Sequence, residues 1–269
     1  MPQAGRHRRY APEFALIAAA MLISVLGFWD IYFGPGPGAQ PHHHLHIATA
    51  FIWMGLLLAQ LVLIARGDRQ NHRKLGLAVL VAGPLLVATT SALSVLSAYK
   101  GVASGKGDFL IVQNVMVTLE IGLIVFLAFL LKRRRELHAS LLMSTTILFM
   151  GIALFFALIA FLPQFRIEGP ETFYRFQTAA MTGQVICLAT GLLFFFRDRR
   201  NGWPFLLAGA CFPVNEAIRS LLTNSDLIDL LTETVGAMSQ PLTFVATFVL
   251  LFSLLAATAL PERRQRRPV

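Results

Sequence analysis

The sequence predicts an all-α protein, a polytopic bundle of transmembrane helices with about eight spans. Of its 269 residues, 56% are hydrophobic and only 14% are charged, whereas about a quarter of the residues of a typical soluble domain are charged. A membrane span needs about 20 mostly apolar residues, and eight such stretches follow one another with short connections between them. No connection is long enough to form a core of its own, so we expect residues 1–269 to form a single integral membrane domain.

The expected spans cover residues 12–33, 46–65, 75–98, 109–131, 138–162, 176–196, 203–222 and 241–260. The first is too long for a signal peptide, and it ends in Trp29, Tyr32 and Phe33, which is typical of an interfacial aromatic belt. A turn rich in glycine and proline, residues 34–41, separates it from the second. Residues 223–240 place acidic side chains among leucines and isoleucines, which predicts either a short amphipathic helix on the outer surface or a solvated loop.

The distribution of basic residues predicts the orientation of the chain. Of the 23 lysines and arginines, 18 fall in the two tails and in every second connection, and the alternate connections hold four. The positive-inside rule places the richer side in the cytoplasm, and an even number of spans then puts both termini there. We therefore expect a multi-pass protein of a cell inner membrane, with the lipid bilayer and anionic headgroups at the cytoplasmic face as its partners, and we expect no nucleic acid to bind.

Two helical hairpins resemble each other. In each, a short basic turn is followed by a histidine at the start of the ascending helix, first at His72 and again at His138, 66 residues later. This weak repeat predicts that the third and fifth helices run parallel, each starting at the cytoplasmic surface.

The second helix carries His46, Trp53 and Gln60 at intervals of seven residues, so the three side chains share one face. The stretch that follows the helix supplies His72 and Arg73. The full pattern comprises Gly27, Phe28, Tyr32, His46, Trp53, Gln60, Leu63, His72, Arg73, Leu75 and Gly76. It resembles an uncharacterised family of bacterial polytopic membrane proteins, whose hallmark is a His, Trp and Gln helix followed by a His-Arg-x-Leu-Gly hairpin.

The resemblance covers roughly residues 25–150 and implies a similar fold and a bacterial origin, but no activity. The chain departs from the family pattern at Asp30, and at Ala139 and Ser140, where the second histidine is usually followed by basic residues. These departures weaken any inference of a shared cofactor.

The depth of the histidines limits which of them can share a ligand. His46 opens the second helix at the outer surface, whereas His72 and His138 lie at the inner one, nearly 30 Å away at about 1.5 Å per helical residue. His72 and His138 could hold haem b or a lipophilic cofactor such as a quinone, with Arg73 at haem propionates. Alternatively, these histidines cap helices or contact lipid phosphates.

The outward histidines suggest a separate site. Imidazoles bind copper and zinc, so His44 and His46 are candidate metal ligands near the outer surface.

Polar side chains inside the expected spans form another group of candidates: Gln60, Glu120, Gln184, Asn215, Glu216 and Arg219. Ionisable groups in hydrocarbon are costly unless they face partners or water. The group therefore predicts either a polar cavity that serves as a path for a proton or substrate, or interhelical hydrogen bonds that only stabilise the bundle.

These observations favour an integral inner-membrane protein of redox type that binds haem or quinone at its inner face. The alternatives are a small-molecule, ion or proton transporter, and a membrane sensor or assembly scaffold. The sequence identifies no catalytic residue, and it leaves open whether the protein is an enzyme.

Overall fold

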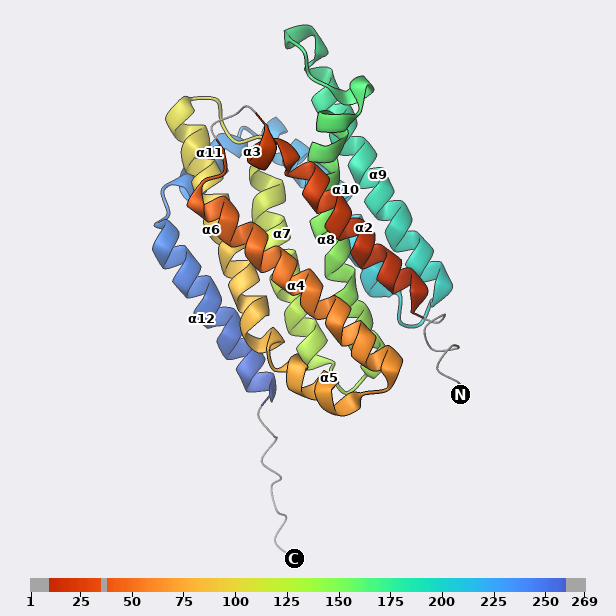
Figure 1. The fold of residues 1–269 in the computed structure, drawn as a ribbon. Helices are drawn as coiled ribbons and strands as arrows, with labels where there is room; N and C mark the ends of the chain where they lie inside the picture. Colours follow the sequence, from red (N-terminus) through yellow and green to blue (C-terminus); the bar gives the residue numbers. More distant parts are fainter. Residues whose placement is uncertain (1–9, 35–37, 260–269) are drawn as a thin grey trace, which may run out of the picture.

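The computed structural model describes residues 10–34 and 38–259, and all regular elements in these two ranges are helical (Figure 1). The α-helices are α2 (Ala11–Gly27), α3 (Trp29–Phe33), α4 (Pro41–Arg66), α5 (Arg69–Gly76), α6 (Val79–Ser104), α7 (Ile111–Leu130), α8 (Arg135–Phe161), α9 (Tyr174–Arg197), α10 (Trp203–Asn224), α11 (Ile228–Gly236) and α12 (Gln240–Ala259). Two short 3-10 helices, Pro163–Phe165 and Pro170–Thr172, precede α9. Among the described residues, seven helices are long and apolar enough to cross a membrane. The chain is therefore a multi-pass integral membrane protein with an all-α fold.

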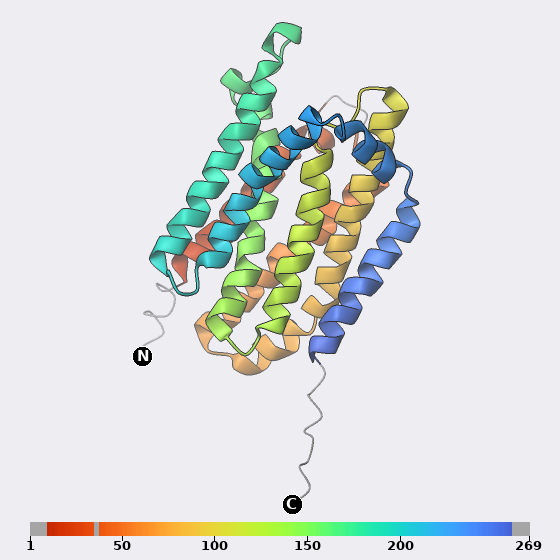
Figure 2. The same cartoon turned by 180° about the vertical axis from the view of Figure 1, so that it is seen from behind.

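The helices run between two chemically different ends of the bundle. The start of α2, the whole of α5 and the end of α12 lie together at one end, whereas α3 and α11 lie at the other (Figures 1 and 2). We call the first end the basic end, because the connections there contain residues 66–74, 132–135 and 197–200 with most of the described cations. The basic residues of the two tails, Arg6, Arg8, Arg9, Arg263, Arg264, Arg266 and Arg267, lie outside the described residues.

Helix α8 lies at the centre of the bundle, and α12 lies at its periphery. In the span window of α8, 67% of the residues are buried, compared with 11% for α12. Helices α2, α7, α9 and α10 all pack against α8, whereas α12 packs mainly against α6. The apolar outer face of α12 is what a lipid-exposed helix needs.

Small residues bring α9 and α10 into backbone contact. A Cβ atom on Gly209 would lie only 2.6 Å from the backbone oxygen of Cys187, and Gly191 approaches the backbone at Phe205 in the same way. Packing through small residues of this kind replaces the hydrophobic driving force that helices lack inside a bilayer.

The first expected span differs from the structure. It is not one helix over residues 12–33, because α2 ends at Gly27 and the short α3 begins at Trp29. At the break, the Gly27 backbone lies against the backbone of Ala153 on α8, where no Cβ atom would fit. The 17-residue α2 is consequently shorter than the other seven apolar helices.

The two similar hairpins also differ from each other. His138 lies in the first turn of the continuous helix α8, whereas His72 lies on the separate helix α5, which ends before α6 begins at Val79. The repeated sequence pattern therefore does not produce a repeated local structure.

Of the two readings of residues 223–240, the helical one is confirmed, because this segment contains α11. Val235 of α11 packs with Val95, Ala98, Ile111 and Val112, so the helix covers the ends of α6 and α7. The acidic residues among apolar ones are the sequence pattern that predicts this helix.

Candidate functional site

Two side chains near the basic end, one on α4 and one on α5, have buried polar atoms without a hydrogen-bond partner among the described residues. Gln60 points from α4 into the bundle and is only 8% exposed. Its side-chain nitrogen and oxygen are both buried without a hydrogen-bond partner in the described part of the chain. Buried amides are normally hydrogen-bonded, so this one requires an explanation.

A tight turn positions α5 beneath Gln60. Helix α4 ends at Gly67, whose φ of 77° suits glycine, and the backbone nitrogens of Gly67 and Asp68 donate to the carbonyls of Ile64 and Leu63. This pair of bonds is a Schellman motif, which reverses the chain within two residues. A Cβ atom on Gly76 at the end of α5 would lie 3.6 Å from Gln60 Nε2.

Asp68 starts α5. Its carboxylate accepts hydrogen bonds from the backbone nitrogen of Asn71, at 3.1 Å, and from the Asn71 side chain, at 2.7 Å. These bonds stabilise the ionised form and lower the pKa of Asp68. This N-cap fixes the orientation of the short helix that carries His72.

His72 is the second unpartnered group of the junction. It lies four residues before Gly76, on the same side of α5. Its Nδ1 atom is buried without a partner among the described residues. Burial, and then the neighbouring His138, lower the pKa of His72 below its ordinary value of 6.5. A neutral imidazole has one nitrogen that donates and one that accepts, so His72 can offer either to a ligand.

His138 is held in one orientation. Its Nδ1 atom lies 2.7 Å from the backbone oxygen of Ala128 at the end of α7, and the Phe129 ring packs edge-on at 6.0 Å. A carbonyl oxygen only accepts, so Nδ1 must carry the hydrogen. In the neutral ring, the lone pair then lies on Nε2, and a nitrogen of this kind can accept a hydrogen bond or ligate a metal.

The outer rim of this junction is basic. Arg69, Gln70, Arg73 and Lys74 line a surface hollow of about 410 Å³ on α5. Arg69, Arg73 and Lys74 are exposed, and they give the hollow its positive charge. We refer to Gln60, His72 and His138, with Arg73 at the rim, as the junction site.

Trp53 does not belong to the junction site, although it shares a face of α4 with Gln60. Its indole nitrogen donates to Thr145 Oγ1 on α8 at 2.9 Å, and the side chain is fully buried. Trp53 is therefore a satisfied core residue that joins α4 to α8.

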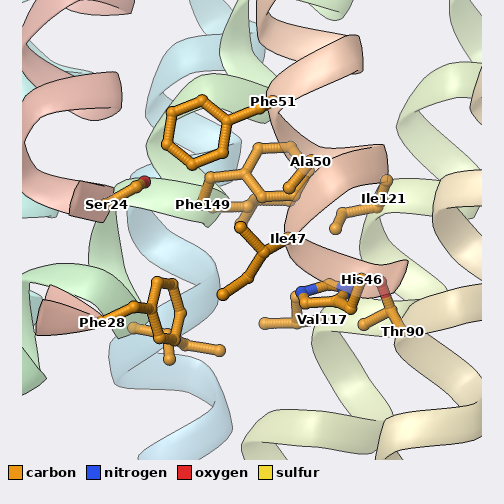
Figure 3. A pocket seen from close by; sticks show the side chains of 12 residues that line it. Ser24, Phe28, His46, Ile47, Ala50, Phe51, Thr90, Val117, Ile121 and Phe149 are labelled. Carbon is orange, nitrogen blue, oxygen red and sulfur yellow. The ribbon is translucent and has the colours of Figure 1, made fainter. Parts of the chain in front are cut away.

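The candidate metal ligands His44 and His46 face different surroundings. The His44 ring packs against Tyr32 with a centroid distance of 5.3 Å. His46 Nδ1 lies 3.4 Å from Thr89 Oγ1, and His46 and Thr90 line a pocket of about 60 Å³ opposite Phe28 (Figure 3). Within residues 10–34 and 38–259, no group of three or more His, Cys, Asp or Glu side chains could hold a metal ion.

The residues of the expected polar cavity lie in several separate places. Gln60 lies at the basic end with the histidines, and Gln184 lies on α9, which packs against α8 and α10. Glu216 and Arg219 form a bidentate ion pair on α10, with N–O distances of 2.9 and 2.6 Å. Glu120 and Asn215 are the members of this set that meet across two helices, α7 and α10, in the described part of the chain.

Two backbone features of the junction have no signal in the sequence. These are the Ala128 carbonyl that orients His138, and the approach of Gly76 to Gln60. Both depend on how neighbouring helices end. The sequence does show that Gly76 follows His72 by one helical turn, which is the spacing that brings it to the same face.

Comparison with protein-family models, curated protein sequences and solved structures finds no match for this chain.

Proposed function

We propose that the protein binds the polar head of a lipophilic redox compound of the quinone class at the junction site. The single observation that supports this most strongly is the buried Gln60 amide, whose donor and acceptor both lack partners in the described residues. A quinone carbonyl would accept from Gln60 Nε2, and its isoprenoid tail would lie in the surrounding hydrocarbon. The proposal includes a bacterial inner membrane, with the basic end in the cytoplasm.

The two histidines would add further hydrogen bonds to the head of the bound compound. The tautomer of His138 leaves Nε2 as an acceptor, which would bind a hydroxyl of the reduced compound. Unpartnered Nδ1 of His72 would complete the contacts to the head. Arg73 on the rim would attract the anionic lipids that surround the entrance.

Binding can be measured with the protein in phospholipid nanodiscs free of endogenous quinone. A short-tailed ubiquinone analogue should bind the wild-type protein, and Gln60→Leu should weaken binding about tenfold, because one buried hydrogen bond of about 1.4 kcal/mol is lost. Gln184→Leu is the matched control, since it makes the same change on α9. Equal affinities for the wild type and Gln60→Leu would refute the proposal.

Haem b is the second candidate, favoured by the free Nε2 of His138. An absorption spectrum of protein purified from haem-producing cells tests it. A Soret band that shifts on reduction with dithionite and disappears in His138→Ala would replace the quinone proposal. A colourless preparation would eliminate haem and leave the quinone proposal in place.

The orientation has its own test. A Gln70→Cys variant should react with a membrane-impermeant maleimide in inverted membrane vesicles but not in intact spheroplasts, because α5 should face the cytoplasm. The native cysteines, Cys187 and Cys211, lie within spans. The opposite labelling pattern would reverse the proposed topology.

A further inference from the structure

Helices α7 and α10 meet through polar side chains in the middle of the bundle, away from the junction site. Asn215 is fully buried, and its Nδ2 atom donates to Gln113 Oε1 at 3.3 Å. Gln113 and Glu120 lie seven residues apart and share one face of α7. The Glu120 carboxyl, halfway along α7, is approached from α10 by Asn215 and Cys211.

Two acceptor atoms in this cluster lack a donor. Asn215 Oδ1 and Glu120 Oε2 are both buried, and neither has a hydrogen-bond partner among the described residues. An amide oxygen can only accept, and so can an ionised carboxylate. If Glu120 were ionised, two acceptors would lie unsatisfied in the same low-dielectric region, which is unfavourable for both.

No described residue supplies a compensating positive charge. On α10, Arg219 is engaged by Glu216 and lies over the Phe109 ring at 4.9 Å. The other helices packed against α7 are α6, α8 and α12. Their titratable residues are Tyr99 and Lys100 at one end of α6 and Arg135, Glu136 and His138 at the opposite end of α8, while the described part of α12 has none.

Helix α11 covers the start of α7, and it carries Asp229 and Glu233, which are both exposed. Cys211 is therefore the titratable group that faces Glu120 directly. A carboxylate without a counter-charge in hydrocarbon either takes up a proton or binds a cation.

We propose that Glu120 is a reversible proton-binding site, protonated at neutral pH in the membrane, with its hydroxyl donating to Asn215 Oδ1. One proton on Oε2 converts an unsatisfied acceptor into a donor, and it also satisfies the second acceptor. The amide nitrogen of Asn215 remains bonded to Gln113, which leaves the Asn215 oxygen available as the acceptor. The site is independent of the quinone proposal, because it shares no residue with the junction site.

A lipid-soluble carbodiimide tests the proposal, since this reagent modifies protonated carboxyl groups in apolar surroundings. In phospholipid nanodiscs at neutral pH, Glu120 should be modified about tenfold faster than Glu216, because the Glu216 carboxylate is engaged by Arg219. Peptide mass mapping locates the modification. It should be absent in Glu120→Gln, persist in the control Glu216→Gln, and decrease as the pH becomes alkaline.

Infrared spectroscopy covers the case in which the reagent fails to reach the site. The difference spectrum between wild type and Glu120→Gln at neutral pH should contain the carbonyl stretch of a carboxylic acid. A spectrum with only carboxylate bands would overturn the proposal. Protection from the carbodiimide by sodium, but not by choline, would also overturn it, because it would show that the oxygens bind a metal cation instead of a proton.

Discussion

The junction site and the Glu120–Asn215 cluster both contain buried polar atoms without partners, yet they differ in position and charge. The junction site lies where α4 ends, beside a basic surface hollow, and its unpartnered atoms belong to the Gln60 amide and the His72 imidazole. The Glu120–Asn215 cluster lies halfway along α7 and contains a carboxyl group. The comparison suggests that a ligand satisfies the hydrogen bonds of a neutral group near a helix end. A carboxyl group in the middle of the membrane is instead satisfied by binding a proton.

The largest expected effect comes from Asn215→Leu. This change removes the bond to Gln113 and the acceptor proposed for the Glu120 hydroxyl, which should lower the free energy of unfolding by about 2–3 kcal/mol. Denaturant titration in detergent micelles would measure it, with Gln184→Leu as the control. An unchanged stability would mean that the cluster does not join α7 to α10.

Gln60→Leu should have the opposite effect on stability, and should stabilise the ligand-free protein. The amide has no partner to lose, so an apolar side chain of similar size should raise the free energy of unfolding by about 1 kcal/mol. The same titration measures this gain. A loss of stability would show that Gln60 has an internal partner, and it would remove the main support for the quinone proposal.

The pH dependence of stability should report on His72. Its folded-state pKa lies below 6.5, so the unfolded chain binds more protons as the pH falls through 6.5 toward the folded-state value. Stability should decrease over that interval, and His72→Phe should reduce the decrease. His44→Phe, an exposed control, should leave the profile as it is in the wild type.

The last prediction concerns the rim. Arg73→Gln should weaken the retention of anionic phospholipid by about 1 kcal/mol at low ionic strength, because it removes one cation near the headgroups. Native mass spectrometry of the lipid-bound protein measures the retained lipid. Lys106→Gln, near the opposite end of the bundle, is the matched control and should retain the wild-type amount.

Hydropathy was sufficient to predict the all-α membrane fold, because about 20 apolar residues in a row have few alternatives. It could not predict the break after Gly27, where the α2 backbone approaches the backbone of Ala153 on α8. The depth argument separated His46 from His72 and His138, which lie on α5 and in the first turn of α8. The rotation of each helix about its own axis decides which polar side chains meet. The sequence does not give this rotation, so it could not show that Gln60 and Glu120 lie in different places.

The packing of α2 against α8 has a consequence for biosynthesis. Leu16, Ile17 and Ala20 are buried, and the helix that α2 mainly contacts begins at Arg135, more than a hundred residues further along the chain. At about 5–20 residues per second, α8 follows α2 out of the ribosome with a delay of roughly 5–20 s. During that interval, lipid or the insertion machinery must contact the face of α2 that α8 later covers. The helices therefore cannot pack in the order in which they are synthesised.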